Sequence, residues 1–221
     1  MTHVGRNSRE MTGLQTNAFG RRVAAITALG VIATLLCNGI ASADVPVDKK
    51  LTWNGTFPII GRLDPITTEI VTTLPSPITA GTPGSASFTV NVDAPPLATT
   101  GLRDIQAATV QGTADAWIFL TDPNGTKTIV DAQLTIPSTP TPAAGQDLTF
   151  SATGTVRFPG PFDTGTALVA IDTDHVTTTL DPKKADGSDT VLKTFTVTLH
   201  IDSTTPPQDP TLGQVQVVTA S

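Results

Sequence analysis

The stretch "SASFTVNVD" at residues 85–93 decides the fold, because polar and apolar residues alternate along it without a break. One face carries serine, threonine and asparagine, and the other face consists of Ala86, Phe88, Val90 and Val92. Successive side chains of a β-strand point to opposite faces of a sheet, so this period of two predicts a strand that is buried on one face only.

The same alternation recurs along the chain. It is strong in "DLTFSATGTVRF" (147–158) and "KTFTVTLHID" (193–202), and weaker in the segments 51–60, 66–74, 108–120, 128–136, 166–171, 175–180 and 214–218. The stretches "DPNG" (122–125) and "ADGSD" (185–189) have the composition of hairpin turns. This pattern predicts an all-β chain, folded as an immunoglobulin-like antiparallel β-sandwich of about ten strands.

Acidic residue usage argues against helices. Only two of the 19 acidic residues are glutamate, and aspartate favours turns over helix interiors. We expect one helical turn at most, at residues 101–106. The stretch "IPSTPTPAAGQ" (136–146) is either a linker between two half-size domains or a long connection that crosses between sheets.

Residues 1–43 have the organisation of a secretory signal peptide. Four arginines precede an apolar run at residues 23–37, which is too short to span a bilayer as a helix, and Ala41 and Ala43 form an Ala-x-Ala cleavage site. We therefore expect a secreted mature chain that begins at Asp44. General secretion is favoured over twin-arginine export, although an Arg-Arg pair at residues 21–22 leaves the second route open.

Cys37 is the only cysteine of the chain and raises an alternative. A bacterial lipoprotein would retain this cysteine as its acylated first residue. The residue before it, Leu36, is bulky where the processing enzyme needs a small one. We therefore expect the cysteine to be removed with the signal peptide, and a lipid-anchored surface protein remains the alternative.

The mature chain is acidic. Four of the 13 basic residues and one of the 19 acidic residues lie in the signal peptide, which leaves a net charge of −9. Nucleic acids and anionic membrane surfaces require a basic footprint, so neither is an expected partner. The mature chain also contains no second apolar segment that would span a membrane.

The segments "LTWNGTFPIIG" (51–61), "PITAGTPGSASFTV" (77–90), "LTFSATGTVRFPGPFDTGTALV" (148–169) and "QDPTLGQVQV" (208–217) resemble a β-sandwich domain of secreted actinobacterial proteins. That family has no assigned function. Because the resemblance covers most of the mature chain, it favours a single domain at residues 44–221. Family members often carry one cysteine near the position of Gly55 and another near Leu199 or His200. This chain has neither, so the resemblance implies that a disulfide between those strands is missing here.

The chain has no recognisable catalytic motif: G-x-S-x-G and H-E-x-x-H are absent, and the mature part has no cysteine nucleophile. His200 falls on the polar face of its strand. His175 follows Asp172 and Asp174, but a shift of the apolar phase at Thr173 indicates a bend, where aspartates usually bond their own backbone. We therefore expect no enzyme, no metal site and no cofactor. A hydrolase whose residues meet only in the fold remains an alternative.

Trp117 and Phe119 are the candidate ligand-binding residues. They lie two residues apart on the polar face of the segment 108–120, so they would stand side by side as an aromatic platform for a sugar or a protein. The alternative is that a long connection, such as 136–146, covers them. Trp53 shares its face with Leu51 and Phe57 and is expected in the core.

These observations predict a module that is secreted or attached to the cell surface and has a structural or binding role outside the cytoplasm. Its expected partner is a polymer or protein of the cell envelope.

Overall fold

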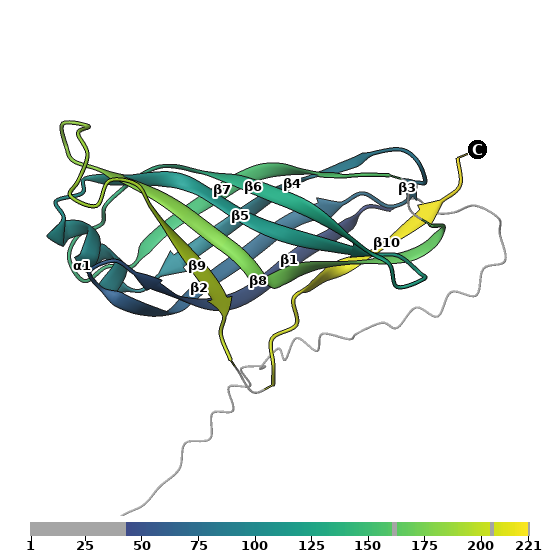
Figure 1. The fold of residues 1–221 in the computed structure, drawn as a ribbon, viewed down its shortest axis with the longest axis horizontal. Coiled ribbons are helices and arrows are strands. Elements are labelled where there is room, and N and C mark those ends of the chain that lie inside the picture. The colour runs from purple at the N-terminus through teal and green to yellow at the C-terminus, as the bar shows by residue number, and fades with distance from the viewer. Residues whose placement is uncertain (1–42, 161–162, 204–205, 221) are drawn as a thin grey trace, which may run out of the picture. The chain divides into compact units, whose positions relative to one another are not determined.

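The computed structural model describes residues 43–160, 163–203 and 206–220. Residues 1–42 of the expected signal peptide and Cys37 lie outside these ranges. Within them the chain forms ten strands and one helix (Figure 1). The elements are β1 (Val45–Phe57), β2 (Gly61–Leu74), β3 (Ile78–Thr79), β4 (Gly84–Ala94), α1 (Pro96–Asp104), β5 (Thr109–Thr121), β6 (Lys127–Pro140), β7 (Leu148–Phe158), β8 (Gly165–Lys183), β9 (Phe195–Ile201) and β10 (Thr211–Val218).

The strands form a closed barrel and not the expected immunoglobulin-like sandwich. In the described part of the chain, eight strands follow one another in the order β8-β5-β6-β7-β4-β2-β1-β9, and β9 pairs again with β8. The expectation of a sandwich was wrong because alternation shows only that one face of each strand is buried, which holds for both architectures. The all-β prediction is confirmed.

Strand β8 explains how the barrel closes. Its first half, residues 165–170, pairs with β10, and its second half, residues 176–180, pairs with β9. The two segments 166–171 and 175–180, expected as separate strands, are therefore one strand of 19 residues. The expected bend at Thr173 is a bulge in this strand, since Ile118 of β5 faces Ile171 and Ala116 faces Val176.

The short connections agree with the expected turns, with two differences. At 122–126 the Asp122 carboxylate accepts hydrogen bonds from the backbone N–H groups of Asn124 and Thr126. Residues 136–140 belong to β6, so the stretch 136–146 is neither a linker nor a crossover. The helix begins earlier than expected, at Pro96, directly after Pro95.

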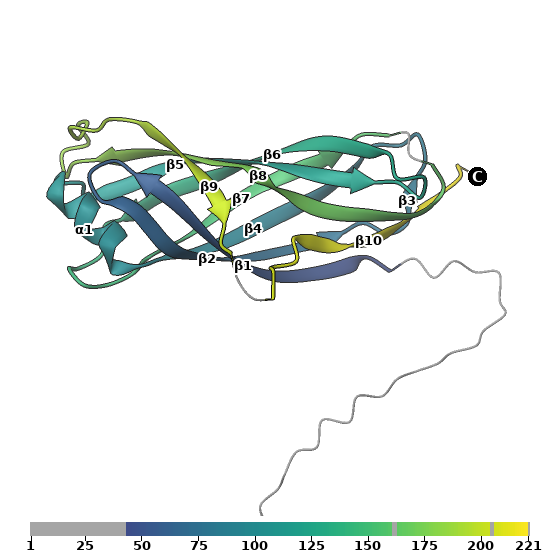
Figure 2. The same ribbon diagram turned by 60° about the horizontal axis from the view of Figure 1, so that its bottom comes forward.

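The helix lies at one end of the barrel and β3 lies at the other (Figures 1 and 2). Neighbouring strands are antiparallel, so strand ends and strand starts alternate around the α1 end. The strands that end there are β1, β4, β6 and β8, and those that start there are β2, β5, β7 and β9. No helix in residues 43–160, 163–203 and 206–220 is long and apolar enough to cross a membrane.

Candidate ligand-binding cavity

The barrel interior contains an apolar cavity of about 140 Å³ that extends to the α1 end, where Phe57, Ala94 and Ala98 line it. Small side chains leave this space: Ala114 and Ala116 of β5, Ala132 of β6 and Ala152 of β7 face inward, where larger residues would fill the barrel. Most of the remaining lining is leucine, isoleucine, valine and phenylalanine. An engineered cavity of about 150 Å³ with a similar lining stays dry and binds benzene.

Several inward-facing side chains are only half-buried, which agrees with a cavity at their surface. Ala114, Ala116 and Val90 all pack against the core and line the cavity, yet each keeps part of its surface exposed. Close packing would bury such residues completely. The exposed part of these side chains therefore marks the wall of an internal space.

Trp53 is the only tryptophan on the cavity wall, and its predicted place in the core is confirmed, since 3% of the residue is exposed. Its indole Nε1 donates a hydrogen bond of 2.9 Å to the hydroxyl of Thr68, which in turn donates to the Leu51 carbonyl at 3.3 Å. The Thr68 hydroxyl is thus already engaged at the wall. The indole ring is well placed to report on whatever enters the cavity.

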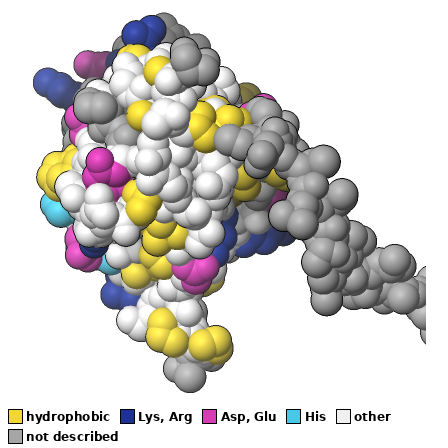
Figure 3. All heavy atoms as spheres, turned by 90° about the vertical axis from the view of Figure 1, so that its right-hand side faces the viewer, with side chains coloured by type: hydrophobic (Ala, Val, Ile, Leu, Met, Phe, Trp, Pro, Cys, Tyr) yellow, Lys and Arg dark blue, Asp and Glu magenta, His cyan; other side chains and the backbone are white. Residues whose placement is uncertain are grey.

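The half of the barrel opposite α1 is filled by its own side chains. Leu74, Leu120, Val156, Phe158 and Val215 are each less than 2% exposed there. Figure 3 looks onto that end, and the surface not covered by grey atoms consists largely of uncharged side chains with hydrophobic ones scattered among them. The cavity therefore stops short of this end of the barrel.

Trp117 and Phe119 lie on the outer face of β5, as the alternation predicted. Each is half-buried, and the connection after β6 does not cover them, because residues 136–140 pair with 109–112 further along the barrel. The Trp117 ring stacks instead on the His175 ring, with centroids 3.8 Å apart and planes at 15°. The Lys127 ammonium lies 4.9 Å from the centre of the Phe119 ring. One face of the expected platform is therefore already occupied.

The bulge of β8 positions His175. Its Nδ1 lies 2.6 Å from a carboxylate oxygen of Asp172, which is 7% exposed and also accepts the backbone N–H of Asp174 at 3.0 Å. The expected backbone bonding of aspartates at this bend is confirmed. Among the described residues, the His175 side chain is hydrogen-bonded to this carboxylate, and no hydrogen bond is found between His175 and a serine or threonine hydroxyl. His200 lies exposed on β9, as expected.

No group of three or more histidine, cysteine, aspartate or glutamate side chains within the described part of the chain is placed to hold a metal ion. The cavity was not predicted from the sequence. The signal that would have suggested it is the run of small residues on the inward face of β5, Gly112, Ala114 and Ala116, since three adjacent inward positions there lack a large side chain.

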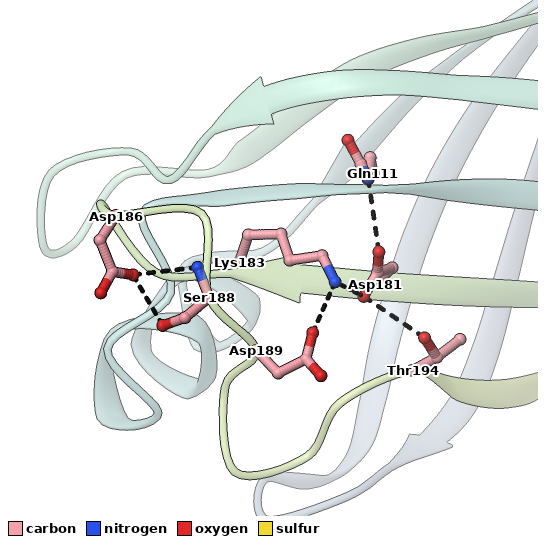
Figure 4. Close-up of polar contacts among 7 residues, drawn as sticks. All are labelled: Gln111, Asp181, Lys183, Asp186, Ser188, Asp189 and Thr194. Carbon is pink, nitrogen blue, oxygen red and sulfur yellow. Dashed lines mark hydrogen bonds and ion pairs between the residues drawn. The ribbon is translucent and has the colours of Figure 1, made fainter.

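Charged groups gather at the α1 end around Lys183 at the end of β8 (Figure 4). Its ammonium lies 2.6 Å from Asp189 and 2.9 Å from Asp181, and these hydrogen bonds raise the pKa of Lys183. Lys183 in turn lowers the pKa of Asp181, with help from the Gln111 amide and the Thr194 hydroxyl. These contacts fasten the loop 184–194 to the barrel wall.

The chain matches a known protein family to which no function has been assigned. A family model described as "Family of unknown function (DUF6801)" matches residues 52–213, from within β1 to within β10. No curated protein and no solved structure matches the chain.

Proposed function

The chain belongs to this family of unknown function, DUF6801, and from the barrel itself we propose that it is a secreted binding protein that holds a small apolar ligand in its interior. The observation that carries the proposal is the apolar cavity of about 140 Å³ beside Trp53. Small-molecule sites are typically concave and mostly apolar, and the mouths of β-barrels are common places for them.

Secretion is part of the proposal. Its support is the agreement between the expected cleavage after Ala43 and the start of the barrel, because β1 begins at Val45. Asp44, the expected first residue, accepts a hydrogen bond from the backbone N–H of Ser76 at 3.3 Å. Removal of residues 1–43 would thus leave every strand intact. The resemblance to a domain of secreted actinobacterial proteins adds an actinobacterial source to the proposal. We propose no catalytic activity.

The test of ligand binding uses the fluorescence of Trp53. The substitution Trp117→Phe leaves Trp53 as the only tryptophan, and the chain has no tyrosine. Bromobenzene has the size of the ligand that fits such a cavity, and its bromine quenches an adjacent indole. We expect saturable quenching. Quenching that rises linearly with concentration, as for an indole in free solution, would refute the proposal.

Two further variants show whether the quencher lies in the cavity. Ala116→Leu places a larger side chain in the space and should weaken bromobenzene binding at least tenfold. Thr113→Leu adds the same side chain to the outer face of the same strand and should leave binding unchanged. Equal effects of the two substitutions would place the bromobenzene outside the barrel.

A second candidate is an outer binding face on β5 and β6. Ile129, which is 50% exposed, pairs with Phe119 and continues the apolar strip beside Trp117. This face would bind a polymer or protein of the cell envelope. Trp117→Ala combined with Phe119→Ala should then abolish retention of the protein on isolated cell envelopes, whereas Ala116→Leu should not. Unchanged retention of the double variant would refute this candidate.

A further inference from the structure

We propose that the ligand is a single-chain amphiphile, whose alkyl tail enters the cavity beneath α1 while its polar head stays outside at that end of the barrel. This inference rests on the proposed binding function and adds the chemical class of the ligand and its route.

The lining suits a hydrocarbon tail and excludes a charged group. No side chain of the described lining that faces inward is ionisable: Asp115, which contributes to the wall, points outward and accepts a hydrogen bond from Gln133 at 2.9 Å. The hydroxyl of Thr68 is bonded to Trp53 and Leu51. A carboxylate or ammonium brought inside would lose its hydration without gaining a partner, which is strongly unfavourable. The polar end of any ligand must therefore remain outside.

The space continues beneath α1, whereas the outer hollow that shares Val92 and Phe150 with the main cavity is lined mainly by polar and charged residues. A smaller cavity of about 40 Å³ lies beneath the helix, and it shares four wall residues with the main cavity, namely Phe57, Ala98, Leu148 and Leu180. The opposite half of the barrel is closed by completely buried side chains. A tail that reaches Trp53 would therefore pass under α1 along this shared wall.

The helix is held weakly. It buries only Ala98, Thr99 and Leu102, and the Thr99 hydroxyl is buried without a hydrogen-bond partner, which typically costs about 1–3 kcal/mol. Pro95, which precedes the helix, provides no side-chain cap. Within the described part of the chain, one hydrogen bond is found from an α1 side chain to another segment: Arg103 donates to the Pro142 carbonyl at 3.3 Å, in an exposed position. The neighbouring loop 184–194 also has a buried hydroxyl without a hydrogen-bond partner, at Thr190, but its Asp189 is paired with Lys183 of β8 at 2.6 Å (Figure 4). Entry by this route requires α1 to move aside.

Exposed apolar side chains surround the helix. Ile59 in the β1–β2 turn is 60% exposed, Leu97 of α1 is 43% exposed and Val191 in the loop 184–194 is 77% exposed. Three large apolar residues on three separate segments at one end provide a surface that an alkyl chain can contact before it enters. The two other exposed large apolar residues of the described chain, Val71 and Ile129, lie on the barrel wall.

The orientation of the ligand is testable with brominated decanoate in the Trp117→Phe background. Decanoate with bromine on its terminal carbon should quench Trp53, and decanoate with bromine next to the carboxylate should not. Across unbranched carboxylates, Kd should fall about fourfold per added methylene, equivalent to about 0.8 kcal/mol, until the cavity is full. A cavity that holds benzene is full at a tail on the order of six carbons. Equal quenching by both bromodecanoates would overturn the orientation.

The route is testable with a disulfide between α1 and the β1–β2 turn. A Cβ atom placed on Gly101 would lie 3.7 Å from the Cβ of Ile60, which matches the usual spacing across a disulfide, about 3.8 Å. We expect oxidised Ile60→Cys/Gly101→Cys, made in a chain with Cys37→Ala, to bind terminally brominated decanoate at least tenfold more slowly than the reduced form.

The control is a disulfide at the closed end. Thr166→Cys/Gln216→Cys links β8 to β10, where these residues pair directly, and its oxidation should leave the rate unchanged. An unchanged rate in the oxidised α1 variant, or slowing in the control alone, would overturn the route. Saturable quenching by bromobenzene without quenching by either bromodecanoate would overturn this inference and leave the proposed function standing. Absence of both signals would refute the proposed function itself.

Discussion

Filling the cavity should stabilise the barrel, and Ala116→Leu is the substitution that tests this most simply. The empty space of about 140 Å³ corresponds to a cost of about 3 kcal/mol at the usual value of about 24 cal/mol per Å³, which sets the upper limit of the gain. A leucine adds three carbon atoms, each worth about 0.8 kcal/mol when buried, and loses about 0.5–1 kcal/mol of side-chain entropy. The net expected gain in the free energy of unfolding is about 1–2 kcal/mol.

Urea unfolding of the parent and of Ala116→Leu measures this difference, and thermal unfolding should show Tm raised by about 3–6 °C. Thr113→Leu on the outer face is the matched control and should change the free energy of unfolding by less than about 0.5 kcal/mol. Inserting a leucine into a fully packed core typically destabilises by about 1–3 kcal/mol. A destabilised Ala116→Leu would therefore show that no usable space exists at this position and would refute the argument from the cavity.

Three other predictions concern the barrel seam, the acid response and the mature protein. Gly55 of β1 pairs with Leu199 of β9 where the barrel closes, so Gly55→Cys/Leu199→Cys should oxidise to a disulfide within one chain; persistence of two free thiols under air would contradict this pairing. Asp209 accepts hydrogen bonds from the hydroxyl and backbone N–H of Thr211 and from Lys49, and these contacts lower its pKa from 3.8 to about 2. The ionised carboxylate therefore contributes to the free energy of unfolding above pH 3.8, and this contribution is lost as the pH falls to about 2. In urea unfolding, Asp209→Asn should lose less stability than the parent over that range. Equal losses would contradict the assigned contacts. The intact mass of the protein from culture supernatant should correspond to a chain that starts at Asp44, and an acylated chain that starts at the cysteine would show a lipoprotein instead.

The sequence predicts the strands well because their signal is local. The alternation at residues 85–93 corresponds to β4, and the phase shift near Thr173 corresponds to the bulge in β8. Both follow from which neighbouring residues are apolar, since the pleat of a strand converts this order directly into burial.

Barrel closure could not be predicted in the same way. It depends on β9 pairing with both β1 and β8, a contact between segments more than a hundred residues apart in the case of Gly55 and Leu199. Alternation fixes the face that each residue occupies and leaves the neighbouring strand unspecified. The resemblance did carry one correct hint, because it placed the positions of Gly55 and Leu199 near each other.

The cavity was missed for a related reason. Ala114 and Ala116 occupy inward positions, and an alanine there is equally compatible with a neighbour that fills the space and with a void. Aromatic residues on a polar face, such as Trp117 and Phe119, can be recognised in the sequence, whereas a volume enclosed by eight strands depends on all of their side chains together.

The central claim is that the α1 half of the barrel accepts an apolar molecule. A crystal structure of the protein soaked in bromobenzene, with the anomalous signal of bromine recorded, tests it most directly. The account predicts a bromine peak inside the barrel, between Trp53 and Ala116. A well-diffracting crystal with no peak there, or with its peak on the outer face beside Trp117, would contradict it.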